Sequence, residues 1–159
     1  MSGIVETREA FMREALVEAD RAASLGEIPV GAVIERDGNV IARGYNRRRV
    51  DKDPTAHAEI IAMREAGRVV GDWRLDGCTM YVTLEPCPMC AGAIALARLD
   101  AVWYGASDKC QGCCGSVYRI TEDAALGVYV PANGGLLADE CAFKLNRFMD
   151  KLRDMRQSM

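Results

Sequence analysis

One histidine and two cysteines of this sequence have the types and spacing of a metal site. Cys87 and Cys90 are three positions apart, so both sulfurs lie on one face of a helical turn. His57, the only histidine, lies upstream of them. Imidazole nitrogen and thiolate sulfur are ligands of zinc, and three protein ligands leave a fourth position open for water. The sequence therefore predicts a catalytic site with one Zn²⁺ per chain.

Each ligand segment carries the signals of a helix N-terminus. Pro88 suits the first position of a helix, where its missing N–H costs nothing, so Cys87 is the expected N-cap. Thr55 is the expected N-cap of a second helix, whose first turn would hold His57 and Glu59. On a regular helix these two residues point about 200° apart, so they share a site only if the helix end points at it. We therefore expect two helix N-termini to meet at one metal ion.

Glu59 is the candidate catalytic residue, because it could move the protons of a zinc-activated water. Zinc lowers the pKa of water bound to it toward roughly 7, which allows attack on an electron-poor ring carbon that bears an amine. Glu59 would take the water proton and pass it to the ring nitrogen and to the departing ammonia. The pattern H-x-E with P-C-x-x-C, here at 57–59 and 86–90, is the signature of zinc nucleobase deaminases. It indicates a hydrolytic enzyme.

A structural zinc module is the alternative class of function. It would close the metal site with a fourth protein ligand, which Cys110, Cys113 or Cys114 could supply. These three cysteines could also form a second metal site or a redox pair, or simply occupy a glycine-rich loop, and we favour the loop. Glu59 and a chain long enough for a sizeable core favour an enzyme.

Composition and charge restrict the class of protein further. The chain has 159 residues, of which 50% are hydrophobic and 27% charged, so we expect one globular domain over 1–159. No apolar run reaches the roughly 18 residues of a membrane span, and no signal peptide is recognisable. We therefore expect a cytoplasmic protein without a membrane partner. The net charge of −3 restricts any basic nucleic-acid footprint to a local patch.

Hydrophobic periodicity predicts the elements that position these residues. Helices are expected over 6–24, 55–66, 87–98 and 136–156. Strands are expected over 29–36, 40–45, 78–84 and 101–104, with a short fifth strand at 128–130. Asp37-Gly38 signals the turn of a hairpin between the first two strands, and Gly67 is the expected end of the second helix. This order predicts a mixed five-stranded sheet covered by helices on both faces, an α/β protein.

Polar residues after the second predicted strand are candidate substrate contacts. The hairpin should bring Asn46 near the metal, where its amide could bind a base or a ribose, or merely end the strand. Arg47, Arg48 and Arg49 are candidate nucleic-acid contacts through phosphate groups, although charge runs more often form solvated surface. The basic residues of the last helix allow the same two interpretations.

Taken together, these motifs resemble those of the bacterial tRNA adenosine deaminases, which convert the wobble adenosine to inosine. The resemblance covers nearly the whole chain, through segments 29–33, 44–47, 53–59, 81–93, 115–116 and 137–141. It implies a three-layer α/β/α cytidine-deaminase-like fold, a homodimer and a tRNA anticodon loop as partner. It also implies zinc on His57, Cys87 and Cys90, with Glu59 as the proton shuttle.

The resemblance further implies where a substrate would be held. It assigns Asn46 and Ala58 to the target nucleoside and Asp108 to the loop that borders it. Those enzymes carry an Asn-His pair where this chain has Gly127 and Val128. Bacterial guanine deaminases resemble the chain in the same two zinc motifs, so a free purine base or nucleoside, or a related aminoheterocycle, is the alternative substrate.

Overall fold

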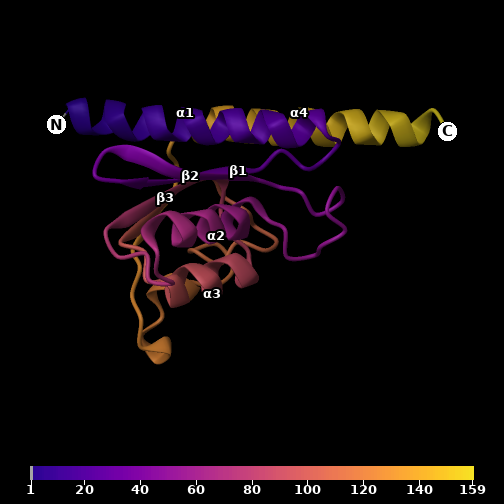
Figure 1. Ribbon diagram of the computed structural model, residues 1–159. Coiled ribbons are helices and arrows are strands. Elements are labelled where there is room, and N and C mark those ends of the chain that lie inside the picture. The colour runs from indigo at the N-terminus through magenta and orange to yellow at the C-terminus, as the bar shows by residue number, and fades with distance from the viewer. Residues whose placement is uncertain (1) are drawn as a thin grey trace.

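The computed structural model describes residues 2–159 as a sheet with two helices on each face (Figure 1). Helices α1 (Ser2–Ser24) and α4 (Ala138–Gln157) lie side by side on one face, joined by ion pairs of Arg13 with Glu140 and of Lys144 with Asp20. Helices α2 (Ala58–Val70) and α3 (Pro88–Ala97) cover the other face. The predicted three-layer α/β/α arrangement is confirmed.

The sheet is mixed and five-stranded, as predicted, with the order β2-β1-β3-β4-β5. Strand β1 (Gly31–Arg36) pairs antiparallel with β2 (Asn39–Tyr45) and with β3 (Cys78–Leu84). Strands β3, β4 (Ala101–Ala106) and β5 (Ala132–Asn133) run parallel. Asp37 and Gly38 have positive φ angles of 53° and 83°, which suit the two-residue turn of the predicted hairpin.

The fifth strand does not lie at 128–130, as predicted, but at 132–133. The Val130 N–H donates to the Thr121 carbonyl at 2.7 Å, so it is not available to strand β4. Thr121 belongs to the short helix η1 (Ile120–Glu122), which precedes η2 (Ala124–Leu126). The apolar run at 128–130 correctly indicated burial of Val130 but could not show which neighbour takes its hydrogen bond.

The predicted N-cap of α2 is also wrong. The Thr55 N–H and hydroxyl both donate to Asp53 Oδ1, at 2.8 and 2.7 Å, so this side chain forms a local turn instead of capping the helix. His57 is the N-cap, with extended backbone angles of φ −80° and ψ 154°. This position of His57 agrees with the predicted site, because it places the imidazole at the N-terminal end of the helix.

The end of α2 lies beyond the predicted Gly67. Gly71 adopts the left-handed conformation at φ 79°, and its N–H donates to the Gly67 carbonyl at 2.8 Å. The remaining element boundaries shift by a few residues. Helix α3 agrees with the sequence in detail, with Cys87 as N-cap and Pro88 at its start. No helix in residues 2–159 has the length and apolar character needed to cross a membrane.

Candidate metal and substrate site

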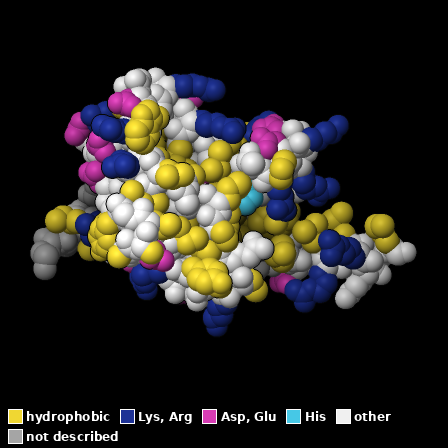
Figure 2. Space-filling view, turned by 90° about the horizontal axis from the view of Figure 1, so that it is seen from below, with side chains coloured by type: hydrophobic (Ala, Val, Ile, Leu, Met, Phe, Trp, Pro, Cys, Tyr) yellow, Lys and Arg dark blue, Asp and Glu magenta, His cyan; other side chains and the backbone are white. Residues whose placement is uncertain are grey.

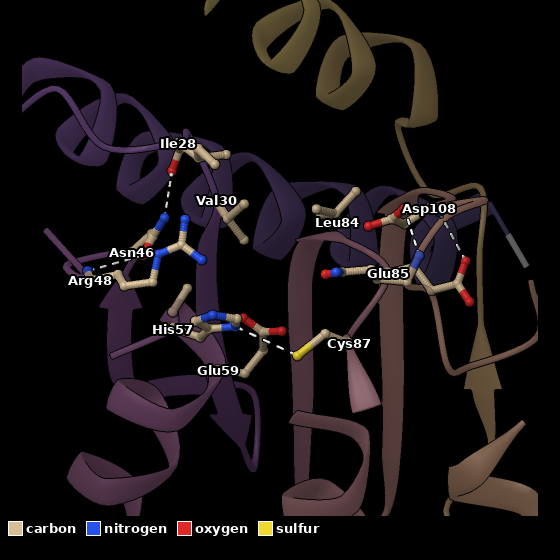
Figure 3. A pocket seen from close by; sticks show the side chains of 12 residues that line it. Ile28, Val30, Asn46, Arg48, His57, Glu59, Leu84, Glu85, Cys87 and Asp108 are labelled. Carbon is tan, nitrogen blue, oxygen red and sulfur yellow. Dashed lines mark hydrogen bonds between the residues drawn. The ribbon is translucent and has the colours of Figure 1, made fainter. Parts of the chain in front are cut away.

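The N-termini of α2 and α3 converge on one point, as predicted (Figure 3). The first contributes its N-cap His57, and the second contributes its N-cap Cys87 and, from its first turn, Cys90. His57 Nδ1 lies 3.6 Å from Cys87 Sγ and 3.5 Å from Cys90 Sγ. All three candidate ligand atoms lie within 4.8 Å of one another.

These distances fit a tetrahedral zinc ion. Zn–S bonds of about 2.3 Å and Zn–N bonds of about 2.0–2.1 Å at a tetrahedral angle place sulfur and nitrogen about 3.5–3.6 Å apart. The observed separations of 3.6 and 3.5 Å agree with that value. Two soft sulfurs with one imidazole also suit zinc better than Mg²⁺ or Ca²⁺. The site therefore fits one zinc ion per chain.

The electrostatics of the cluster already favour a thiolate. Hydrogen bonding from the Cys90 thiol, and next from His57, lowers the pKa of the Cys87 thiol to about 4. The same sharing raises the pKa of Cys90, because its proton is held toward Cys87. A thiolate is the form that binds metal, so Cys87 already has the charge state of a metal ligand.

Glu59 lies beside the ligands without being one of them. Its side chain is buried and lines the same pocket as His57 and Cys87 (Figure 3). Burial raises the pKa of its carboxyl group, since the charged form loses its hydration. A buried carboxyl group next to a metal site is placed to exchange protons with whatever occupies the pocket.

The pocket has a volume of about 170 Å³. This is below the roughly 300–1,000 Å³ of sites for drug-sized ligands, so it suits a single base or nucleoside. Four apolar residues, Ile28, Val30, Ala58 and Leu84, contribute to its lining. The segment after β2 forms one wall and the loop after β4 forms the opposite wall (Figure 3).

The structure brings all three predicted substrate-contact residues to this pocket. Asn46 and Ala58 line it from one side and Asp108 from the other. Asn46 Nδ2 donates to the Ile28 carbonyl at 3.3 Å, and its Oδ1 accepts from the Arg48 N–H at 3.2 Å, so the amide is held in one orientation. Asp108 Oδ1 accepts two backbone N–H groups of its own loop, from residues 110 and 111.

The three consecutive arginines have three different environments. Arg48 alone lines the pocket. Arg47 is engaged with Asp51, at 3.0 and 3.1 Å, and with the Tyr45 hydroxyl. Arg49 faces a separate groove between the end of α1 and α4. Of the three candidate phosphate contacts, Arg48 is therefore the one that the structure places beside the metal site.

The three cysteines of the later loop lie outside the ligand group. Within residues 2–159, His57, Cys87 and Cys90 form the one group of His, Cys and carboxylate side chains close enough to share an ion. Cys110 is exposed, whereas Cys113 and Cys114 are buried. Burial raises the pKa of Cys114 to about 12, so it is an inert core thiol at neutral pH. Among the described residues no fourth protein ligand joins the site, which argues against a structural zinc module.

Glu85 is a pocket residue to which the sequence gave no role. It lies between the end of β3 and the cysteine motif, is almost fully buried, and lines the pocket. Its carboxylate accepts backbone N–H groups from Asp108, Cys114 and Ser116 at 3.0–3.1 Å. The position of Glu85, a charged residue directly after the buried strand β3, was the one signal in the sequence that could have indicated this role.

Gly127 and Val128 do not line this pocket. They border a shallow hollow with Arg98 and Asp100, at the C-terminal end of α3. The metal ligands lie at the N-terminal end of that ten-residue helix, about 15 Å away along its axis. The two positions that differ from the Asn-His pair therefore lie away from the metal ligands and the pocket.

Comparisons with known proteins agree with this geometry. Residues 5–106 match the family described as the cytidine and deoxycytidylate deaminase zinc-binding region. A tRNA-specific adenosine deaminase of Bacillus subtilis (strain 168) is 41% identical over 150 residues, covering 94% of this chain and 93% of that protein. One of Haemophilus influenzae is 46% identical over 153 residues, covering 96% and 88%.

Solved structures give the same result. A structure from a study of A-to-I editing by tRNA:A34 deaminases has a TM-score of 0.82 at 45% identity, covering 86% of this chain and 99% of that one. A guanine deaminase from Bacillus subtilis has a TM-score of 0.60 at 41% identity, covering 77% and 70%. The fold and the site thus define a zinc-dependent hydrolytic deaminase. The chain belongs to the cytidine and deoxycytidylate deaminase family and, within it, to the tRNA-specific adenosine deaminases.

Proposed function

We propose that this enzyme converts adenosine to inosine at the wobble position of a tRNA anticodon loop, with release of ammonia. The observation that carries the proposal is a base-sized pocket at the His57–Cys87–Cys90 group, in a chain 41–46% identical over nearly its whole length to tRNA-specific adenosine deaminases. The substrate resides in the cytoplasm, and we infer the same location for the enzyme.

The residues divide the reaction between them. His57 Nδ1 and the sulfurs of Cys87 and Cys90 would hold a zinc ion, which would supply a Lewis acid for the activation of water. Glu59 accepts the proton of the attacking water and delivers protons to the ring nitrogen and the leaving amine. Water adds, ammonia departs, and the amino group is replaced by a carbonyl. Asn46 and Ala58 contact the nucleoside, and Asp108 holds the facing loop.

Arg48 extends this site toward the RNA backbone. It lies on the pocket wall, and no described acidic side chain pairs with it. A guanidinium at the rim of a nucleoside pocket is placed to bind the phosphate next to the target. This positive charge for phosphate binding is local, which agrees with the net charge of −3 of the whole chain.

Deamination of a free purine is the second candidate function. The likeness to a guanine deaminase from Bacillus subtilis, 41% identical with a TM-score of 0.60, favours it. The substrate assay below separates the two functions.

We further propose that the enzyme acts as a homodimer. Large apolar side chains are exposed on α3 and in the segments that follow β4: Leu96 at 71%, Tyr118 at 66% and Tyr129 at 70%. Hydrophobic side chains also gather around the histidine on the face shown in Figure 2. A second copy of the chain would remove such surface from water.

Ammonia release by the zinc-loaded enzyme tests the substrate directly. One set of reactions holds an anticodon stem-loop with a wobble adenosine, and a second holds the free bases and nucleosides of adenine, guanine and cytosine. A stem-loop with guanosine at the wobble position is the matched control. Turnover of the adenosine stem-loop alone supports the proposal, whereas turnover of a free purine alone would establish the second candidate.

A further inference from the structure

The two walls of the substrate pocket are each held by one buried glutamate that takes no part in the proposed chemistry. On one side, Glu27 lies between α1 and β1 and is 1% exposed. Its carboxylate accepts the Arg49 N–H at 2.9 Å and the Val50 N–H at 3.3 Å. These two residues belong to the segment that carries Asn46 and Arg48 to the pocket. Glu27 thus anchors the first wall.

On the other side, Glu85 is 2% exposed and anchors the loop after β4. It accepts the N–H groups of Asp108 at 3.1 Å and of Cys114 and Ser116 at 3.0 Å, and also the Ser116 hydroxyl. The loop packs directly on this carboxylate, because a Cβ at Gly112 would lie 2.4 Å from the Glu85 carboxyl carbon. Asp108 and Gln111, which line the pocket, are on the loop that it holds.

Both anchors are strong for the same physical reason. A buried carboxylate is costly unless hydrogen bonds satisfy its oxygens, and bonds to a charged acceptor are stronger than those between neutral groups. For Glu27 and Glu85 the donors come from the wall segments. A wall that moved away would leave a carboxylate buried and unsatisfied, so each glutamate favours one position of its wall.

We propose that Glu27 and Glu85 are positioning residues that hold the two pocket walls at the separation required by the bound nucleoside. The proposal rests on the function proposed for this pocket. Neither residue is a member of the ligand group, and the metal ligands and Glu59 lie on α2, α3 and their N-caps rather than on the walls. Loss of an anchor therefore weakens substrate binding more than it slows the chemical step.

Glutamine at each position keeps the shape and removes the charge. At position 85, one oxygen accepts from Asp108 and the other from Cys114 and Ser116, so an amide NH₂ in either orientation faces a backbone N–H. At position 27, one remaining oxygen can still accept from Arg49. We therefore expect a larger effect from Glu85→Gln than from Glu27→Gln.

Glu18→Gln is the matched control. Glu18 is also 1% exposed, but it lies on α1 near Arg21 and Arg43, at 3.6 and 3.8 Å, and does not line the pocket. We measure zinc content, kcat and KM for the three variants on the substrate that the wild-type enzyme turns over. We also measure amide hydrogen exchange over 46–53 and 107–116.

The expected result is a split between KM and kcat. Glu85→Gln raises KM about tenfold or more, equivalent to about 1.4 kcal/mol of binding, while zinc content stays at one per chain and kcat changes by less than about threefold. Exchange becomes faster in 107–116 for Glu85→Gln and in 46–53 for Glu27→Gln. Glu18→Gln leaves KM and both segments unchanged.

Several results would overturn the proposal. One is a lower thermal stability with unchanged KM and unchanged local exchange, which would make the glutamates structural only. Loss of zinc from Glu85→Gln would show that it acts on the metal ligands instead of the wall. If Glu85→Gln does not fold, the same measurements on Ser116→Ala and Glu27→Gln test the proposal. If the wild-type enzyme is inactive on the stem-loop, the tRNA function is refuted but the anchor proposal is not. The anchors can still be tested by KM on a free purine or, without turnover, by hydrogen exchange.

Discussion

At the scale of single residues, Glu59 lines the same pocket as His57 and Cys87 but does not belong to the ligand group. The imidazole and the two sulfurs lie at zinc-compatible distances, whereas the Glu59 carboxylate lies outside that group. Metal content and turnover should therefore respond differently when each kind of residue is changed.

Glu59→Ala should keep one zinc per chain and lose turnover. The three ligands remain, but the carboxyl group beside them is removed, and the oxygens of Glu85, which also lines the pocket, already accept backbone N–H groups. We therefore expect kcat to fall by about 10²–10⁴. Metal analysis and ammonia release on the same preparation measure both quantities. Activity close to wild type would show that another group moves the proton.

Cys87→Ala should lose both the metal and the activity. The variant keeps His57 and Cys90, which are too few ligands for a stable site. Cys110→Ala is the matched control, since that cysteine is exposed and outside the ligand group, and it should retain zinc. Full zinc retention by Cys87→Ala would remove Cys87 from the ligand set.

At the scale of elements, the position of α2 depends on close packing against β2. Gly44 lies on β2 directly beneath the first turns of α2, where an added Cβ would be 2.3 Å from the Ala58 carbonyl oxygen and 2.8 Å from the Ala62 nitrogen. Both contacts are with backbone, which cannot rotate away. A side chain at this position would push the helix that brings His57 and Glu59 to the site.

Gly44→Ala should therefore destabilise the fold and reduce activity together. We expect a loss of about 1–3 kcal/mol in the free energy of unfolding, as for other overpacked interiors. The control is Gly92→Ala on α3, where an added Cβ meets no atom within 4 Å and should stabilise the helix by up to about 1 kcal/mol. Urea unfolding measures both. Equal stability of the two variants would show that α2 is not held by this contact.

At the scale of the whole molecule, the fold has a core that is independent of the metal. Two clusters of buried apolar side chains lie on the two faces of the sheet, and none of the three ligands belongs to either cluster. The protein therefore differs from small zinc modules, whose folding free energy comes largely from the ion.

Removal of zinc by a chelator should abolish turnover while the protein stays folded. We expect the far-ultraviolet circular dichroism to be retained and the melting temperature to fall, because an ion that binds only the native state stabilises it. Added zinc should restore both properties. Unfolding upon chelation would instead support the structural zinc module as the function of the site.

The sequence alone predicted the chemistry of this site. His57, Glu59, Cys87 and Cys90 were predicted as site residues from residue type and spacing, and the α3 N-terminus from Pro88, because these signals are local and do not depend on distant contacts. The pattern of apolar runs also predicted the mixed sheet and its two helical layers.

Only the tertiary structure decided which groups compete for each hydrogen bond. Thr55 does not cap α2, because its hydroxyl donates to Asp53, and His57 is the N-cap instead. The fifth strand lies later than predicted, because the Val130 N–H donates to the Thr121 carbonyl. The sequence also does not distinguish Glu27 and Glu85 from other acidic residues. Only the tertiary structure shows that they are buried and accept hydrogen bonds from the pocket walls. Such roles depend on residues brought together from distant parts of the chain, which spacing along a sequence cannot specify.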